Sequence, residues 1–276
     1  MNGNDMASNK IVFLTCHQKA QVVGPALSQN GFELSTYDAF NTDSLGTFSD
    51  ETKRQLSQMD TALKKAQLAC ELTGSQFGLG SEGSFGPHPQ VHLLPWNYEV
   101  LAFWDAHNEH AIYAVFGTAE TNFASQQVHS LEQAMDFAQQ AQFPGHALIL
   151  GSHLDAYFQK GLQDEAALRE KMKGALQSNS SVWLETDMRA HMNPTRMKAI
   201  AQAAHKLSEL LNSQCPSCQL PGYGLHKYVP GALCLTCGQP TRRPKAEQWH
   251  CLKCHHTEDK PLNSHASAAH CDICNP

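Results

Sequence analysis

Four C-x-x-C pairs in the C-terminal part of the chain constrain its fold more than any other feature. They contain eight of the ten cysteines and are called here the first to fourth knuckles: Cys215/Cys218, Cys234/Cys237, Cys251/Cys254 and Cys271/Cys274. A C-x-x-C turn directs two thiolates at one tetrahedral ion, so two knuckles complete a four-cysteine zinc site. Four thiolates leave no open position for water. The spacing therefore predicts two structural Zn²⁺ ions.

The sequence alone leaves the pairing of the knuckles open. The stretch LCLTCGQPTRRPKAEQWHCLKCHHTED has thirteen residues between its two knuckles and resembles a zinc ribbon by itself, which favours a nested arrangement. CPSCQLPGYG and the terminal CDICNP would then form the second site. Sequential pairing, with gaps of fifteen and sixteen residues, is an alternative, and reduced cysteines without metal are another. Since eight cysteines suffice, the neighbouring histidines are expected to be bystanders: His250, His255, His256, His265 and His270.

Composition limits the class of protein. A chain of 276 residues that is 41% hydrophobic can bury a large core and carry a small appended domain. Its net charge of −6 argues against a non-specific nucleic-acid binder. The longest apolar runs, IVFL and ALIL, are too short to cross a bilayer. The first residues, MNGNDMASNK, lack the pattern of a signal peptide, so we expect a cytoplasmic protein with no membrane partner.

Before residue 213, apolar strand patterns alternate with helical patterns. Helices are expected at 19–31, 49–74, 130–142, 163–177 and 194–212, and strands at 11–15, 31–39, 99–105, 111–117, 146–151 and 181–185. The glycine-rich stretch FGLGSEGSFGPHP (77–89) is expected to be a loop. This alternation predicts a three-layer α/β domain with a mainly parallel sheet. The expected organisation is a disordered tail (1–9), the α/β domain (10–212) and a zinc-ribbon domain (213–276).

The stretch ETDMRAHMNPTRM (185–197) concentrates polar groups where a predicted strand ends and a helix begins. Asn193 can cap that helix and Pro194 can take its first position, which would leave free N–H groups facing Arg189, His191 and Arg196. Helix N-termini beyond strand ends readily bind anions. The simpler interpretation is that Asp187 pairs with an arginine and only fixes the loop.

Other predicted strand ends also carry reactive side chains. His17 and Lys19 follow the first strand, and Glu82, Ser84 and His88 lie in the glycine-rich stretch. Further polar residues lie in the remaining predicted loops: Asp43, Glu51, Arg54, Glu120, Thr121, Asn122 and Lys160. Each alone would be a solvated turn or a cap. Their common position after predicted strands indicates one shared site.

The residue types suggest roles at such a site. Asp43 and Asp187 could hold Mg²⁺ or Mn²⁺, which prefer oxygen ligands. We expect Asp187, His191, His88 and Glu82 to be catalytic. Substrate or anion binding is expected from Arg189, Arg196, Asn193, Thr195, Ser84, Lys160, Asn122 and Arg54. A catalytic zinc bound by His17, His88 or His191 is a third possibility.

Several of these motifs together resemble an uncharacterised bacterial family, a domain of unknown function. They are SEGSFGPHP, TNF, QKG, ETDMRAHMNPTRM, CPSCQLPGYG, the CxxCGxPT knuckle and CDICNP. The family patterns T-x-H-G-K-E and D-T-D-x-x-G-T-F-x-G-E read here as TCHQKA and NTDSLGTFSDE. His17, Lys19, Asp43 and Glu51 match, whereas a glycine, a glutamate and the first aspartate are replaced. The resemblance implies that the motifs belong together, but it implies no activity or substrate.

Two functions from different classes follow. The first is an enzyme, of a metal-assisted hydrolase or phosphoryl-transfer type, that acts on a phosphorylated or carboxylated small molecule. The second is an adaptor or sensor that binds a protein partner, or less favourably nucleic acid, through its zinc ribbons. The only basic run there is Arg242, Arg243 and Lys245, which is short for nucleic-acid binding.

Overall fold

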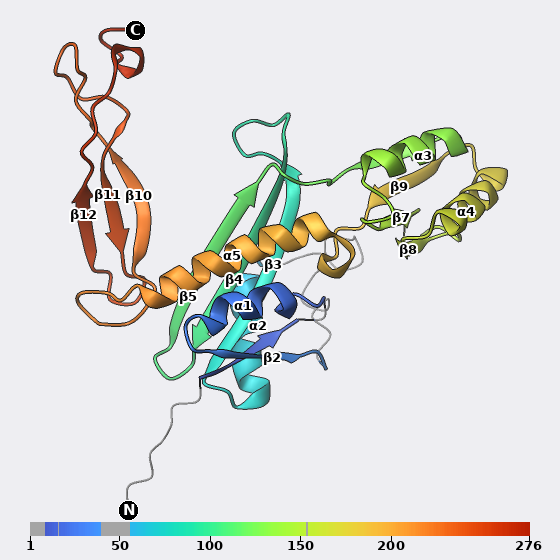
Figure 1. Cartoon of the computed structure of the whole chain (residues 1–276), viewed down its shortest axis with the longest axis horizontal. Helices are drawn as coiled ribbons and strands as arrows, with labels where there is room; N and C mark the ends of the chain where they lie inside the picture. Colours follow the sequence, from blue (N-terminus) through green and yellow to red (C-terminus); the bar gives the residue numbers. More distant parts are fainter. Residues whose placement is uncertain (1–8, 16, 40–55, 153) are drawn as a thin grey trace, which may run out of the picture. The chain divides into compact units, whose positions relative to one another are not determined.

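A computed structural model of the chain describes residues 9–15, 17–39, 56–152 and 154–276 (Figure 1). The chain divides into two compact units. The larger unit, called here the α/β unit, runs up to Glu109 and resumes at Tyr113–Ser208. The smaller, called the cysteine unit, consists of His110–Ile112 and Glu209–Pro276. Residues 1–8 of the predicted disordered tail lie outside the described residues.

The α/β unit contains a five-stranded sheet of order β2-β1-β3-β4-β5. Its strands are β1 (Lys10–Leu14), β2 (Glu33–Tyr37), β3 (Phe77–Pro87), β4 (Pro95–Asp105) and β5 (His110–Thr118). β1 pairs in parallel with β2 and β3, whereas β3 and β4 form a long antiparallel pair. A second sheet, of order β6-β9-β7-β8, contains only antiparallel pairs: β6 (Ser125–Val128), β7 (Leu148–Leu150), β8 (Gln159–Leu162) and β9 (Val182–Thr186).

The predicted mixture of helices and strands is confirmed, but the prediction of a mainly parallel sheet is wrong. Parallel neighbours need a crossover of about a dozen residues or more. Only residues 106–109 separate β4 from β5, and only 88–94 separate β3 from β4. These links are too short for a parallel crossover. The second sheet, with strands 125–128 and 159–162 that the sequence did not predict, adds further antiparallel pairs.

The helices are α1 (Ala20–Ser28), α2 (Gln58–Thr73), α3 (Leu131–Gln140), α4 (Glu165–Ser178) and α5 (Pro194–Asn212), with short 3₁₀ turns at Ala190–Met192 and Ala268–His270. α2 begins later than predicted, because Ser57 caps it by accepting a hydrogen bond from the Asp60 N–H. Residues 49–55 of the predicted helix lie outside the described residues. Gly74 ends α2 at a φ of 69°, as its position predicted.

The glycine-rich stretch predicted as a loop is the strand β3. Its side chains alternate between two faces of the sheet. Gly78 and Gly80 lie on the face that α2 covers, so close that a Cβ atom on Gly80 would lie 2.0 Å from the Ala62 carbonyl oxygen. On the opposite face, Phe77 stacks on Phe103 with ring centroids 5.4 Å apart. The glycines therefore let a helix backbone approach a strand, a role that a loop prediction misses.

The close approach of α2 to β3 yields a stability prediction. Gly80→Ala should lower the free energy of unfolding of the α/β unit by at least about 2 kcal/mol, because the added methyl group overlaps helix backbone. Gly174→Ala on α4 is the control, since nothing lies within 4 Å of its added Cβ, and it should raise stability by about 0.5–1 kcal/mol. Urea unfolding followed by circular dichroism measures both. Equal midpoints for the two variants would contradict this packing.

The second sheet has its own core with α3 and α4. Its buried side chains include Val128, Phe137, Leu148, Leu150, Leu168, Met172 and Leu184. Within the described parts of the chain, no helix is both long enough and apolar enough to span a membrane.

The cysteine unit is built on a three-stranded meander. Its strands are β10 (Gly224–Pro230), β11 (Pro244–His250) and β12 (Thr257–Pro261), and both neighbouring pairs are antiparallel. Each strand runs the length of the meander between its two ends (Figure 1). This arrangement decides where the knuckles lie.

Candidate functional site

The eight knuckle cysteines form two clusters in the cysteine unit. One contains the first and third knuckles, and the other contains the second and fourth. Within each cluster the sulfur atoms lie within 4.8 Å of one another, and the shortest cross-knuckle distances are 3.6–3.9 Å. A tetrahedral zinc ion with Zn–S bonds of about 2.3 Å would place its sulfurs about 3.8 Å apart. Each cluster can therefore hold one metal ion.

Both pairings considered from the sequence are wrong, because the structure interleaves the knuckles. β10 carries the chain from the end of the meander with the first knuckle to the end with the second. β11 returns it to the third knuckle, beside the first, and β12 leads away again toward the fourth. Antiparallel strands thus bring alternate knuckles together. The thirteen-residue gap that suggested a ribbon is instead occupied by a strand that separates the two sites.

Backbone N–H groups prepare the knuckles for metal binding. The Ser217 N–H donates to the Cys215 Sγ and the Thr236 N–H donates to the Cys234 Sγ, both at 3.4 Å. Such bonds favour the thiolate. Backbone hydrogen bonds from Cys237 and Thr236 lower the pKa of Cys234 to about 6, and one from His256 lowers the pKa of Cys254 to about 6. One thiolate in each cluster is therefore available near neutral pH.

In the α/β unit, the stretch 185–197 forms an ion pair at the end of β9, with a buried carboxylate and a partly exposed arginine. The Asp187 carboxylate is completely buried and accepts hydrogen bonds from the Arg189 Nε (3.0 Å), Nη2 (2.6 Å) and backbone N–H (3.0 Å). Both carboxylate oxygens of Asp187 thus have partners. The simpler interpretation of the sequence, in which Asp187 and an arginine fix the loop, describes this pair.

Arg196 is also held by the protein itself. Its Nε donates to the Glu99 Oε1 at 2.8 Å, its Nη1 donates to the Met188 carbonyl oxygen, and its guanidinium lies over the Phe85 ring at 5.0 Å. Glu99 is 1% exposed and Arg196 is 7% exposed. The pair therefore joins α5 to the middle of β4. Gly83 lies beside it, where a Cβ atom would overlap the guanidinium.

The start of α5 does not offer the free N–H groups that the sequence predicted. The Asn193 Oδ1 accepts from the Arg196 N–H at 2.9 Å, and the His146 Nε2 accepts from the Thr195 N–H at 3.3 Å. The Thr195 hydroxyl bonds the same imidazole at 2.9 Å. The Asn193 amide donates to the Asn122 Oδ1 at 2.8 Å. Capping side chains therefore occupy the site where an anion was expected.

A buried lysine lies close to these pairs. The Lys19 Nζ, at the start of α1, donates to the Ser81 Oγ on β3 at 2.8 Å, and the two residues are 6% and 3% exposed. Among the described residues, Lys19 has no carboxylate within ion-pair distance. Burial and the nearby Arg196 lower the pKa of Lys19 to about 7, although Glu99 and Glu82 act in the opposite direction. The amine is therefore partly neutral at physiological pH.

His17 and His191 stack on each other beside this lysine, with ring centroids 5.1 Å apart and planes 15° apart. The Nδ1 atoms of both rings are buried without a hydrogen-bond partner among the described residues, and so is the Asn97 Oδ1 on β4. Burial and Lys19 lower the pKa of His17 to about 3, and burial and Arg189 lower the pKa of His191. Both imidazoles are neutral at pH 7, and their unpartnered buried nitrogens leave hydrogen-bonding capacity unused among the described residues.

Alternation along β3 separates residues that the sequence placed together. Ser81 and Gly83 share the face of Glu99 and Arg196, whereas Glu82 and Ser84 lie on the face that α2 covers. Glu82 forms an ion pair with Lys65 there, and the Ser84 hydroxyl donates to the Gln58 Oε1 at 2.9 Å. Glu82 still lies close enough to raise the pKa of Lys19.

The structure places the remaining predicted residues as follows. His88 lies in the β3–β4 turn, where its Nδ1 accepts from the Gln90 and Val91 N–H groups at 3.1 and 3.0 Å. Asn122 donates to the Ala141 carbonyl oxygen at 3.0 Å, and Lys160 on β8 lies over the Phe158 ring at 5.3 Å. Three predicted residues lie outside the described residues: Asp43, Glu51 and Arg54.

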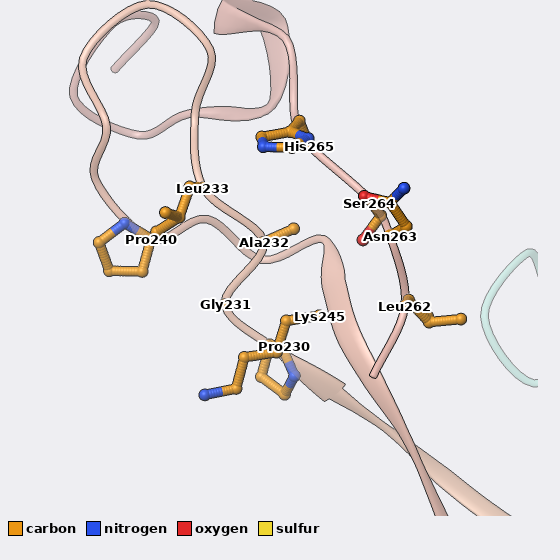
Figure 2. Close-up of a pocket in the computed structure, with 10 residues that line it drawn as sticks. All are labelled: Pro230, Gly231, Ala232, Leu233, Pro240, Lys245, Leu262, Asn263, Ser264 and His265. Atoms are coloured by element: carbon orange, nitrogen blue, oxygen red, sulfur yellow. The ribbon is translucent and has the colours of Figure 1, made fainter. Parts of the chain in front are cut away.

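Two hollows lie on the surface of the described chain. One, of about 360 Å³, lies between the starts of α1 and α5 and is lined by Gln18, Gln21, Val22, Ala190, His191, Pro194, Met197, Lys198 and Ala201. The other lies in the cysteine unit (Figure 2) and is lined by Pro230, Gly231, Ala232, Leu233, Pro240, Lys245, Leu262, Asn263, Ser264 and His265.

Sequence reasoning missed Ser81, Glu99 and His146. Ser81 was overlooked because its strand was taken for a loop. Glu99 interrupts the apolar run of β4, and a buried acid in such a run needs a cationic partner. That signal indicates that a partner exists but cannot show that it is Arg196.

Comparison with known proteins gives a family but no function. Neither the search of curated proteins nor the search of solved structures found a match. A family described as "Domain of unknown function (DUF6671)" matches residues 65–276, which include β3, α5 and all four knuckles. This match spans well over half of the 276 residues. The chain therefore belongs to the DUF6671 family.

Proposed function

We propose that the α/β unit is an enzyme domain that acts on a small molecule bearing a carboxylate or phosphate, and that two Zn²⁺ ions stabilise the cysteine unit. The observation that carries the first part is the buried Lys19 amine, which has no carboxylate partner among the described residues. Isolated buried cations are costly and are rare outside functional sites.

The surroundings of Lys19 support an anionic ligand. Lys19, Arg189 and Arg196 all lie close enough to His17 for their charges to lower its pKa. Among the described residues, the carboxylates of Asp187 and Glu99 pair with Arg189 and Arg196, whereas Lys19 has no carboxylate within ion-pair distance, so protonated Lys19 adds an excess positive charge. A substrate carboxylate or phosphate would balance this excess. The unpartnered Nδ1 atoms of the two stacked histidines supply hydrogen-bonding capacity beside it.

The zinc part of the proposal rests on the donor set. Four thiolates at tetrahedral spacing suit Zn²⁺, which leaves no position for a substrate. A divalent cation in the α/β unit has weaker support, because the two cysteine clusters are the only groups of three or more potential ligands among the described residues. Asp187 already gives both oxygens to Arg189. The proposal therefore rests on Lys19 and assigns no role to a Mg²⁺ or Mn²⁺ ion.

A thermal-shift screen of the full, zinc-loaded chain tests the anionic substrate class. A panel of carboxylates and phosphate esters, with and without Mg²⁺, should contain a ligand that stabilises the chain, and saturation at about 100 times Kd adds about 2.7 kcal/mol. Lys19→Met should lose this stabilisation, because it removes the cation but keeps the length of the side chain. Lys171→Met, at an exposed position of α4, should keep it.

Two results of the screen would contradict the proposal. Stabilisation that persists in Lys19→Met would exclude the Lys19 site. Stabilisation that requires Mg²⁺ would restore a cation-assisted reaction in place of the one proposed. Folding of both variants is checked by circular dichroism, and we expect Lys19→Met to fold, since it removes a buried charge that has no ionic partner.

A partner-binding function of the cysteine unit is the second candidate. Leu235 and Ile273, in the second and fourth knuckles, are 72% and 66% exposed. The hollow of Figure 2 lies in the same unit. Single exposed apolar residues are common on protein surfaces, however, and a structural zinc site needs no partner. The buried cluster around Lys19 has no such ordinary explanation, so the enzyme function ranks first.

A further inference from the structure

The contact between Lys19 and Ser81 joins a potential base to a potential nucleophile. The Nζ and Oγ atoms are 2.8 Å apart, which is hydrogen-bond distance for proton transfer. Lys19 is the only hydrogen-bond partner that the Ser81 hydroxyl has among the described residues. Within that part of the chain, the hydroxyl caps no helix and bridges no strand. Its one interaction is therefore with an amine that can take its proton.

The fold holds Ser81 rigidly. β3 pairs with β4 along its whole length, and Ser81 faces Leu101 in that register. The parallel pairing of β3 with β1 ends at Leu79, so Ser81 lies just past the carboxyl end of β1. Lys19 follows from the same strand end, at the start of α1. Ligands of sheets with parallel strands bind beyond such ends, and rigid strands position reactive groups precisely.

Charged groups on four elements of the described chain act on the Lys19 amine. Burial and Arg196 of α5 lower its pKa to about 7, and Lys65 of α2 also lowers it. Glu99 of β4 and Glu82 of β3 raise it. His17, next to the same strand end, stays neutral at pH 7 because burial and Lys19 lower its pKa to about 3. A lysine in these surroundings is a base at neutral pH rather than a permanent cation.

We propose that Ser81 is the nucleophile and Lys19 the general base of an acyl-transfer reaction on an ester or amide. The Ser81 Oγ would attack the acyl carbon while its proton passes to the Lys19 Nζ. The bond from that carbon to the alcohol or amine breaks, and the leaving group takes the proton from Lys19. Water then attacks the acyl carbon and gives a proton to Lys19. The bond from that carbon to the Ser81 Oγ breaks, Lys19 returns the proton to this oxygen, and the acid leaves.

This inference rests on the proposed enzyme function, because it names the reaction at the same site. The negative charge of the substrate would lie against the protonated amine that forms during the attack. Lys19 would accept the Ser81 proton as the neutral amine, and it would face the substrate anion as a cation only after that transfer.

The test treats the full, zinc-loaded chain with methanesulfonyl fluoride, a small neutral reagent. Attack by Ser81 forms an O–S bond and breaks the S–F bond, so the peptide that contains Ser81 gains a methanesulfonyl group in the mass spectrum. The rate should rise about tenfold per pH unit below pH 7 and level off above it, as Lys19 loses its proton. Lys19→Met should slow labelling at least about 100-fold.

Controls keep the result interpretable. Ser28→Ala, at an exposed position of α1, should not change the rate, and Ser81→Ala should abolish the adduct at that peptide. Circular dichroism establishes that each variant folds. Hydrolysis of p-nitrophenyl acetate by the same variants gives a second readout with a different leaving group.

Absence of reaction at Ser81 with both reagents, or equal rates in the parent chain and Lys19→Met, would overturn the assignment. The result is separable from the anion screen because neither reagent carries a charge. Stabilisation by an anion without labelling keeps the substrate class and rejects Ser81. Labelling without any stabilising anion keeps Ser81 and rejects the substrate class.

Discussion

A chain in which serine replaces all four cysteines of the first and third knuckles should retain one Zn²⁺ ion. The same replacement in the second and third knuckles should retain none. When the first and third knuckles are replaced, the cluster of the second and fourth knuckles keeps its four thiolates. When the second and third knuckles are replaced, each cluster keeps only two thiolates. A structural zinc site contributes about 10–16 kcal/mol of binding free energy, so loss of both ions should also unfold the meander.

Native mass spectrometry measures the zinc content, and circular dichroism reports the strands. A third variant, lacking the first and second knuckles, should also retain no zinc. Nested pairing would instead leave one ion in the variant without the second and third knuckles, and sequential pairing would leave one in the third variant. Two ions should bind the parent chain, so a count of none there would reject zinc at both clusters.

The cysteine clusters show what spacing can and cannot predict. Eight thiols in four C-x-x-C pairs were enough to predict two four-sulfur sites, because the turn geometry is local. The pairing was not local, since it depends on where β10 and β11 carry the chain. Strand-length segments between the knuckles were the available signal. The prediction of a zinc ribbon at 233–259 instead took residues 238–250 for a loop between two knuckles of the same site.

In the α/β unit, too, local sequence patterns predicted the elements better than they predicted which side chains come together. Element types were largely predictable from periodicity, and α5 has its predicted bounds of 194–212. β3 was not predicted as a strand, because its glycines allow α2 to pack close to the strand and do not form a turn. That one error placed Glu82 with Asp187 and hid Ser81. Local residue types predicted a polar site near residues 187–196, but alternation on β3 decided which side chains reach it.

Arg196 was predicted from the sequence to bind an anion, and the structure makes a different prediction for its loss. Arg196→Met should lower the free energy of unfolding by about 3–5 kcal/mol, because it leaves the Glu99 carboxylate buried without its partner. Glu99→Gln in the same chain should recover much of this loss, since the amide carries no charge. Urea unfolding of the parent chain, both single variants and the double variant gives the coupling energy.

The exposed pair of Arg242 and Asp272 supplies the matched control. Its side chains are 85% and 64% exposed, and the Nη2–Oδ1 distance of 2.9 Å is close to the 2.8 Å of the buried pair. Arg242→Met should therefore change stability by less than about 1 kcal/mol, as for other solvent-exposed pairs. A small effect of Arg196→Met, combined with loss of stabilisation by an anionic ligand, would show that Arg196 binds substrate rather than supports β4. A large loss of stability in Arg196→Met that Glu99→Gln relieves would show that Arg196 is a structural residue. Its ion pair with Glu99 would then hold the start of α5 beside Lys19 and Ser81.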